Sequence, residues 1–244
     1  MYYKGVGGRA VFGFLMGIIS NKTSYIRVPG DSGNVSSYPF PMMIEPVNQP
    51  ILRIVEKDPE LLKEYTQVIR KFEEYGVKAI TTVCGFNVVF QEELARASKV
   101  PIFSSSLMQL PIVHKMLPQG RQIGIMTADG RIFRKYKEEL LRCAGMDPAT
   151  PIAISKLEDQ PAWSLLLQGK PFLDQEQIER DVVAGAKEMV CANPEIGAFV
   201  FECHNLPPYG KAVQDATGLA VFDVMTLVDM VYKALVRERY TGIV

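Results

Sequence analysis

Residues 79–87, Ala-Ile-Thr-Thr-Val-Cys-Gly-Phe-Asn, constrain the fold more than any other stretch of the chain. The first five form a short apolar run with β-branched side chains, which is typical of a buried strand in a parallel sheet. Cys84 ends this strand, Gly85 permits a tight turn, and Asn87 can cap a following helix. Ligands bind at this edge of open α/β sheets, and a helix N-terminus there lowers the pKa of a thiol. The stretch therefore predicts an α/β fold with a reactive cysteine.

Residues 195–203 repeat this arrangement near the other end of the chain, with a predicted strand that ends in Cys203. Other landmarks recur at a similar spacing. Gly13 and Gly124 are 111 residues apart (124 − 13), and Cys84 and Cys203 are 119 residues apart (203 − 84). Offsets this similar indicate a duplicated α/β unit.

We therefore expect two pseudo-symmetric three-layer α/β halves with parallel sheets and an active site in the cleft between them. The first domain would comprise residues 1–106 plus 217–244 and carry Cys84, and the second would comprise residues 107–216 and carry Cys203. Facing strand ends would bring both thiols to one cleft, where they could act as a paired acid and base.

Hydrophobic periodicity and capping residues predict the other elements. A first strand is expected over residues 11–19, and a helix runs from about Asp58 to a stop at Gly76. A second long helix starts at its cap Asp174, and a closing helix covers residues 226–239.

Charge balance and cysteine spacing exclude several function classes. The 244 residues include 27 basic and 27 acidic side chains, which gives no basic surface for nucleic acid or an anionic membrane. The longest apolar run, residues 10–19, is too short to span a bilayer. The four cysteines lack close-spaced pairs, so we expect neither a disulfide framework nor a metal site, and a reducing, cytoplasmic setting.

With strand-end cysteines in duplicated α/β halves, the chain resembles the aspartate/glutamate racemase superfamily, which also includes hydantoin racemases, maleate isomerases and arylmalonate decarboxylases. The resemblance extends over nearly the whole chain. Residues 27–41 (RVPGDSGNVSSYPFP), 84–86 (CGF) and 202–205 (ECHN) are similar to a racemase-like branch of this superfamily.

This resemblance implies a cofactor-independent isomerase, a racemase acting on a small carboxylic acid or amino acid. Cys84 and Cys203 would be its catalytic pair: one thiolate removes the α-proton, and the thiol on the opposite face returns one. The superfamily commonly forms dimers, so we expect a homodimer or a higher homo-oligomer.

Departures from the superfamily pattern bear on the substrate. Amino-acid racemases usually follow the first cysteine with Asn-Thr and the second with Thr. Gly85, Phe86 and His204 stand at those positions here, so the side-chain donors that hold an α-carboxylate are missing. These differences argue against an acidic amino acid as the substrate.

Candidate substrate ligands lie after each cysteine, at neighbouring strand ends and in the long loop that follows the first strand. Backbone N–H groups beside the cysteines could bind the developing enolate charge. The predicted substrate-binding residues are Gly85, Phe86, Asn87, Ser105, Thr127, His204, Asn205, Asp31 and Asn34.

Alternatives remain open on the sequence alone. A decarboxylase would use only Cys203 as proton donor, a cis-trans isomerase would attack through Cys84, and a non-catalytic protein would merely bind a small molecule. A plain turn is the default role of Asp31 and Asn34. A satisfied polar residue beside a helix start is the corresponding alternative for His204.

Overall fold

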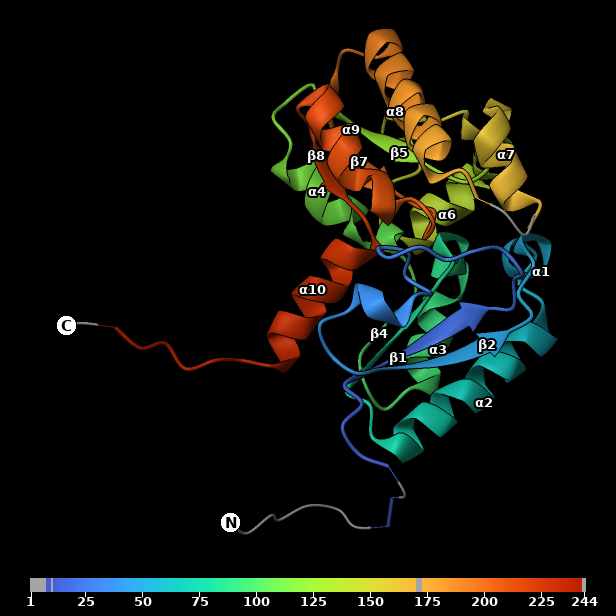
Figure 1. Ribbon diagram of the computed structural model, residues 1–244, viewed down its shortest axis with the longest axis vertical. Coiled ribbons are helices and arrows are strands. Elements are labelled where there is room, and N and C mark those ends of the chain that lie inside the picture. The colour runs from blue at the N-terminus through green and yellow to red at the C-terminus, as the bar shows by residue number, and fades with distance from the viewer. Residues whose placement is uncertain (1–7, 10, 170–172, 243–244) are drawn as a thin grey trace.

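The computed structural model describes residues 8–9, 11–169 and 173–242 of the chain. Within them, two sheets of four strands are flanked by helices, one unit above the other in Figure 1. The strands are β1 (Met16–Asn21), β2 (Met42–Val47), β3 (Ala79–Thr82), β4 (Ile102–Phe103), β5 (Gln122–Met126), β6 (Ile152–Ile154), β7 (Ile196–Phe201) and β8 (Ala220–Phe222).

Helices connect the strands and cover both sheets. The α-helices are α1 (Ile51–Val55), α2 (Pro59–Tyr75), α3 (Gln91–Ala97), α4 (Leu110–Met116), α5 (Gly130–Lys135), α6 (Lys137–Cys143), α7 (Pro161–Leu167), α8 (Gln175–Ala192), α9 (Gly210–Thr217) and α10 (Val224–Leu235). Short 3₁₀ helices are η1 (Val35–Ser37), η2 (Gly85–Phe90), η3 (Ser106–Gln109), η4 (Leu157–Asp159) and η5 (Pro207–Tyr209).

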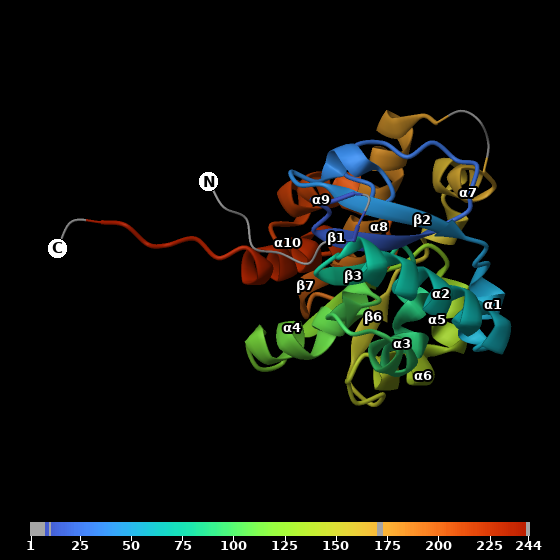
Figure 2. The same ribbon diagram turned by 90° about the horizontal axis from the view of Figure 1, so that it is seen from below.

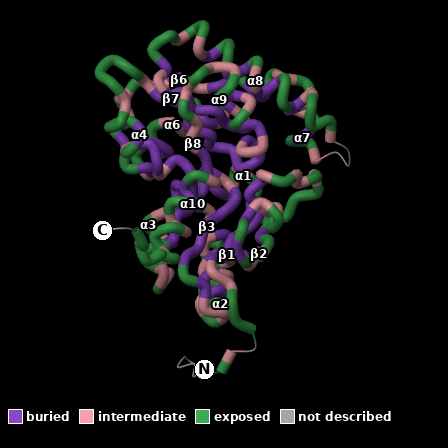
Figure 3. Tube along the Cα trace, turned by 60° about the vertical axis from the view of Figure 1, so that its left-hand side comes forward, coloured by how far each residue is buried: buried purple, intermediate pink, exposed green. Residues whose placement is uncertain are grey.

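The two sheets have the same topology. Their strand orders are β2-β1-β3-β4 and β6-β5-β7-β8, and every pairing between neighbouring strands is parallel. Both strands that precede a cysteine, β3 and β7, hold the same place in their sheets. The predicted fold class, with two parallel α/β halves, is therefore confirmed. Figure 3 shows the central strands of both halves as largely buried.

The predicted equivalence of Gly13 and Gly124 is wrong. Gly13 precedes β1, whereas Gly17 lies within β1 at the register that Gly124 holds in β5, 107 residues later (124 − 17). A Cβ at Gly17 would approach the ring of Phe72 to 2.4 Å, and one at Gly124 would approach Phe199 to 2.8 Å. Both glycines therefore let an aromatic ring pack flat against a central strand.

The first strand also begins later than predicted, at Met16. Val11 and Phe12 are exposed, so the apolar run before Met16 does not enter the sheet. A run of apolar residues does not show at which residue the strand becomes buried, because apolar residues also occur on protein surfaces.

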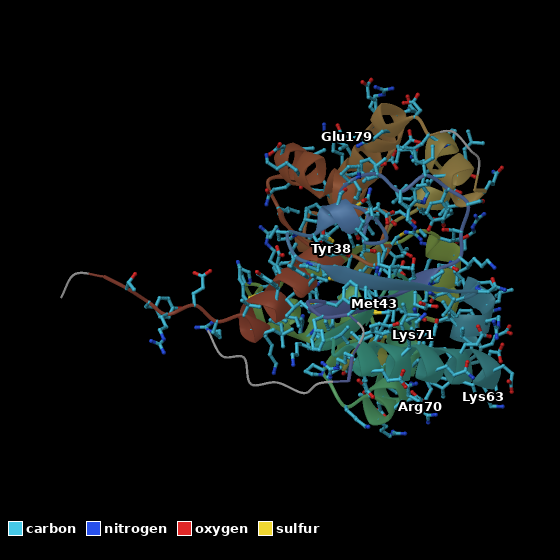
Figure 4. The ribbon with its side chains drawn as sticks, turned by 60° about the horizontal axis from the view of Figure 1, so that its bottom comes forward. Tyr38, Met43, Lys63, Arg70, Lys71 and Glu179 are labelled. Atoms are coloured by element: carbon cyan, nitrogen blue, oxygen red, sulfur yellow. The ribbon has the colours of Figure 1, made fainter. Side chains whose placement is uncertain are left out.

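The long helix α2 follows its sequence signals closely. Asp58 accepts a hydrogen bond from the N–H of Glu60 as N-cap, and Gly76 ends the helix with a φ of 78°. Lys71 forms an ion pair of 2.7 Å with Glu45 of β2, while Arg70 projects outward (Figure 4). The helix α8 likewise starts at its predicted cap Asp174.

The C-terminal segment connects both halves. Strand β8, which the predicted boundary at residue 217 assigned to the first domain, pairs with β7 and belongs to the second sheet. Helix α10 instead buries Val224 and Leu227 against Met16 of β1, beside the first sheet. The division of the chain into domains at residues 106 and 217 otherwise stays a prediction.

The halves also share core. One cluster of buried side chains includes Ile19 and Phe86 from the first half and Ile125 and Phe133 from the second. Helix α6 lies beside the elements of the first half, as Figure 2 shows, and its Glu139 pairs with Lys57 at 3.2 Å. Among the described helices, none has the length and apolar content needed to cross a bilayer.

Gly17→Ala tests the aromatic contact on β1. The added methyl group overlaps the ring of Phe72, so we expect the free energy of unfolding to fall by about 1–3 kcal/mol. Urea denaturation followed by circular dichroism measures the change. The double variant Gly17→Ala/Phe72→Leu is the matched control, since the smaller side chain makes room for the methyl group. Unfolding free energies that show no coupling between the two positions would contradict this packing.

Candidate active site

Both strand-end cysteines line one cavity. Cys84 lies two residues after β3, Cys203 lies two residues after β7, and the cavity between them has a volume of about 270 Å³. The cavity is also lined by residues that follow each cysteine, namely Gly85, Phe86, His204 and Asn205. The equivalent positions of β3 and β7 in their sheets thus place the two thiols around the same space.

The prediction that a helix N-terminus lowers the thiol pKa values is wrong. Burial raises the pKa of Cys84, the charge of Glu202 raises it further, and the nearby N–H groups of Phe86 and Asn87 oppose both effects. Burial and Glu202 likewise raise the pKa of Cys203. The turns that follow the cysteines are short, and a few N–H groups do not compensate for loss of water. Both thiols are therefore protonated near neutral pH.

Glu202 is the side chain that sequence reasoning missed. It also lines the cavity, its residue is 1% exposed, and its carboxylate accepts a 2.7 Å hydrogen bond from the hydroxyl of Thr127. Burial raises its pKa to about 7, although Thr127 and the nearby N–H groups of Ala128, Phe86 and Gly85 lower it. Glu202 therefore changes charge in the neutral pH range.

Gly85 is required at its position by the approach of Glu202. A Cβ on Gly85 would lie 2.4 Å from the backbone oxygen of Glu202 and 2.5 Å from its carboxylate. The two loops that carry the cysteines therefore touch through a glycine of one half and a glutamate of the other.

A network of polar groups holds the loop after Cys203. The thiol of Cys203 lies 3.5 Å from the amide oxygen of Asn205, which also accepts a bond from the hydroxyl of Tyr25 at 3.3 Å. Asn205 donates to Asp31 at 2.6 Å, and Arg27 forms an ion pair with Asp31 at 2.7 Å. Asp31 thus acts on Cys203 through Asn205, from the loop that sequence analysis singled out.

His204 is held on one side only. Its Nδ1 lies 3.0 Å from the hydroxyl of Ser32, whereas its buried Nε2 has no hydrogen-bond partner among the described residues. Burial and the charge of Arg27 lower its pKa to about 3, so the ring is neutral near pH 7. A neutral ring whose Nδ1 accepts the Ser32 hydroxyl carries a proton on Nε2.

The other predicted ligands lie outside the lining of this cavity. Asn87 does not cap a helix: its side chain bonds to Gln49, Thr82 and Tyr65 beneath η2, where Cys84 is the N-cap. Ser105 caps η3, Asn34 caps η1, and Thr127 holds Glu202. Their roles in substrate binding stay predictions.

Tyr25 and Glu202 were missed for identifiable reasons. Tyr25 lies in a long loop with no periodic pattern, and its hydroxyl reaches the cavity by donating to Asn205. Glu202 stands beside Cys203, where alternation along a strand predicts the opposite face, but β7 already ends at Phe201. The position of Glu202 next to Cys203 in the sequence could have identified it as a candidate. Among the described residues, no three potential ligands gather as a metal site.

Comparisons of the sequence with known proteins point to one activity. A dimethylsulfoniopropionate lyase of Durusdinium sp. clade D is 27% identical over 233 residues, covering 93% of this chain and 77% of the relative. Dimethylsulfoniopropionate lyase 3 of Emiliania huxleyi is 32% identical over 190 residues. Those residues cover 75% of this chain and 49% of the relative, so the chain spans about half the length of that relative. No family model matches the chain.

Comparisons of the structure point to the predicted fold. Allantoin racemase from Klebsiella pneumoniae superposes with a TM-score of 0.61 at 14% identity, covering 91% of this chain and 87% of the racemase. A mutant of arylmalonate decarboxylase superposes with a TM-score of 0.63 at 15% identity, covering 92% and 95% of the two chains. Both belong to the superfamily that the sequence resembles, so the resemblance is confirmed at the level of the fold.

The predicted activity is wrong. The chain was expected to be an isomerase that racemises a carboxylic or amino acid, whereas the curated relatives at 27–32% identity are lyases. The racemases among these solved structures share the fold at 14% identity or less. Similarity at this level shows the fold and does not indicate that this chain is a racemase. One fold supports several reactions because each is set by the side chains around the cavity.

The charge of Glu202 gives a pH-dependent stability. Its pKa rises from about 4.5 in the unfolded chain to about 7 in the fold, so the native state binds more protons between these values. The free energy of unfolding therefore falls as pH rises from about 4.5 to 7, by on the order of 3 kcal/mol. Glu202→Gln has no ionisable group at this position, so its unfolding free energy should not show this fall.

The measurement is urea denaturation of wild type and Glu202→Gln at pH values from 4 to 8. As pH rises, the unfolding free energy of wild type should fall relative to that of Glu202→Gln. Glu188→Gln, which removes an exposed carboxylate on α8, is the matched control. A wild-type minus Glu202→Gln difference that stays constant over the whole range would show that the fold does not raise this pKa.

Proposed function

The chain has the fold of the aspartate/glutamate racemase superfamily, and from this fold and its sequence relatives we propose that the protein is a lyase that cleaves the carbon–sulfur bond of dimethylsulfoniopropionate. The observation that carries the proposal is the shared cavity of Cys84 and Cys203. A thiolate at a strand end can remove a proton next to a carboxylate, which is the step that racemisation and elimination have in common.

The substrate contains its own leaving group. Dimethylsulfoniopropionate carries a carboxylate, an acidic α-hydrogen and a dimethylsulfonium group on the β-carbon. When a thiolate removes the α-proton, the released electron pair forms the α,β double bond, and the β-carbon–sulfur bond breaks. The products are acrylate and neutral dimethyl sulfide, and the proton stays on the thiol. All atoms and electrons balance without an oxidant, a reductant or a cofactor.

Elimination needs a base on one face only. Cys84 fits this role better, because the N–H groups of both Phe86 and Asn87 favour its thiolate, whereas Asn205 gives one such group to Cys203, and because Cys84 is partly exposed. Cys203 is more buried, and its thiol faces an acceptor, the amide oxygen of Asn205. We assign Cys84 as the base and Cys203 as a thiol that contacts the substrate from the other side.

Substrate binding can activate this base. Both thiol pKa values are raised in the fold, chiefly by burial. A sulfonium cation that enters the same low-dielectric space lowers the pKa of a neighbouring thiol, because opposite charges attract strongly where water is excluded. The thiolate then forms mainly when its substrate is bound.

His204 is proposed to hold the substrate carboxylate. It lines the cavity, its ring is neutral, and its Nε2 has no partner among the described residues. With the Ser32 hydroxyl donating to Nδ1, the Nε2–H is a free donor for a carboxylate oxygen. A donor in this place also stabilises the enolate charge that develops when the α-proton leaves.

The remaining predictions concern the setting of the protein. We propose a small carboxylate as substrate without a role for nucleic acid, a cytoplasmic location, and a homodimer or higher homo-oligomer, as the sequence led us to expect. Size-exclusion chromatography with light scattering measures the oligomeric state directly.

Replacing the cysteines separates their roles. Cys84→Ser should lower kcat/KM for dimethyl sulfide release at least about a thousandfold, because serine is a far weaker base, which corresponds to about 4 kcal/mol of lost transition-state stabilisation. Cys203→Ser should lower it about tenfold. Gas chromatography of the headspace measures the product, and Cys191→Ser, at an exposed position of α8, is the matched control. A Cys84→Ser variant that stays within tenfold of wild type would exclude Cys84 as the base.

Replacing His204 tests the carboxylate contact. His204→Phe keeps a flat ring without a donor, so KM should rise about tenfold or more, the equivalent of one lost hydrogen bond to a charged group. Ser32→Ala should have a smaller effect in the same direction, because it removes only the group that orients the ring. Initial rates over a range of substrate concentrations give KM and kcat separately. An unchanged KM in His204→Phe would place the carboxylate elsewhere.

A further inference from the structure

The charged side chains that line the cavity are acidic. They are Glu202 and Asp129, and no lysine or arginine lines the cavity within the described residues. A cavity of this kind does not favour a dicarboxylate, whose second negative charge would meet no cation. It favours a ligand that carries a positive charge.

The two acidic residues differ in whether a positively charged side chain lies beside them. Asp129 is the N-cap of α5, accepts bonds from the N–H groups of Arg131 and Ile132, and pairs with the guanidinium of Arg131 at 3.3 Å. Glu202 forms no ion pair with any described residue and is almost fully buried. Asp129 therefore has a counter-ion in the protein, and Glu202 has none among the described residues.

Neutral donors surround the carboxylate of Glu202. The Thr127 hydroxyl donates to it at 2.7 Å, and the N–H groups of Gly85, Phe86 and Ala128 lie near it. These donors fix its position but supply no full positive charge. A buried carboxylate usually acquires a cationic partner, because dipoles alone do not offset the loss of water.

Aromatic and aliphatic side chains line the same cavity. The rings of Tyr25 and Phe86 and the side chains of Ile51, Ile132 and Leu167 contribute to its wall. Methyl groups on a sulfonium or ammonium centre pack against such surfaces, and the faces of aromatic rings attract the positive charge. The wall therefore suits a methylated onium group better than a hydrated ammonium group.

From this arrangement we infer that Glu202 is the counter-ion that recognises the cationic end of the substrate, so the cavity selects carboxylates that carry a methylated onium group. This inference rests on the proposed lyase function and names the specificity determinant of the same site. The attraction to Glu202 also ends with the reaction, which helps the product to leave. When the carbon–sulfur bond breaks, the sulfur becomes neutral, and dimethyl sulfide loses its attraction to Glu202.

A pair of isosteric ligands tests the inference without turnover. The probe 3-(trimethylammonio)propanoate carries a positive charge and a poor leaving group, whereas 4,4-dimethylpentanoate has the same shape and no positive charge. Isothermal titration calorimetry at pH 8 measures both dissociation constants. Wild type should bind the cationic ligand at least about tenfold more tightly, since a charge pair in a water-poor cavity is worth more than 1.4 kcal/mol.

Charge-neutral variants should remove this preference. In Glu202→Gln the ratio of the two dissociation constants should fall to within about threefold, less than 1 kcal/mol. Glu202→Met is a second neutral variant of similar length, in case the amide group of glutamine disturbs the donors around it. Each variant is used only if its circular dichroism and unfolding match a folded protein. A folded neutral variant that keeps the tenfold preference would overturn the inference.

Two matched controls separate charge from packing. Thr127→Val removes one hydrogen bond to Glu202 but leaves its charge, and Asp129→Asn removes the other acidic group of the lining while keeping an N-cap residue. Both should retain the preference for the cationic ligand. Loss of the preference in Asp129→Asn would assign recognition to Asp129 and overturn the role of Glu202.

The same experiment distinguishes this inference from the proposed function. If wild type prefers the cationic probe but releases no dimethyl sulfide from dimethylsulfoniopropionate, the lyase proposal fails and the recognition of an onium group stands. If wild type releases dimethyl sulfide and binds both probes equally, the lyase proposal stands and the role of Glu202 is refuted.

Discussion

The contact between Gly85 and Glu202 determines the geometry of the site. One residue follows the cysteine of the first half, the other precedes the cysteine of the second half, and a Cβ on the glycine would overlap the glutamate. This contact holds the two cysteine loops against each other at the cavity that both thiols line. The carboxylate of Glu202 therefore acts on both cysteines through space and raises the pKa of each.

The surroundings of the two cysteines suit the elimination that we propose for this cavity. Racemisation needs two groups of matched acidity on opposite faces, whereas elimination needs one base and a leaving group. The surroundings of the two cysteines differ here: the N–H groups of Phe86 and Asn87 act on Cys84, which is partly exposed, whereas the N–H group of Asn205 acts on Cys203, which is more buried. This asymmetry agrees with one base rather than with an exchangeable acid–base pair.

Sequence patterns predicted the parts of the structure that depend on neighbouring residues. The cap at Asp58, the stop at Gly76 and the buried positions of α2 follow from helical spacing alone. The two cysteines were found because a strand followed by a tight turn has a local signature that occurs twice. The parallel α/β fold followed from the order of these elements, since a strand, a helix and a strand connect in one favoured way.

Tertiary structure decided what depends on residues far apart in the chain. The equivalent of Gly124 is Gly17 rather than Gly13, and each of these two glycines makes room for an aromatic ring, Phe72 or Phe199, that lies elsewhere in the chain. The thiol pKa values depend on burial, which no local pattern contains. The sequence by itself thus determined the fold class and the two cysteines that share a cavity. Only the folded chain brought Glu202 to that cavity with no cationic partner in the described part of the chain, because long-range packing decides which charges lose water and which partners they find.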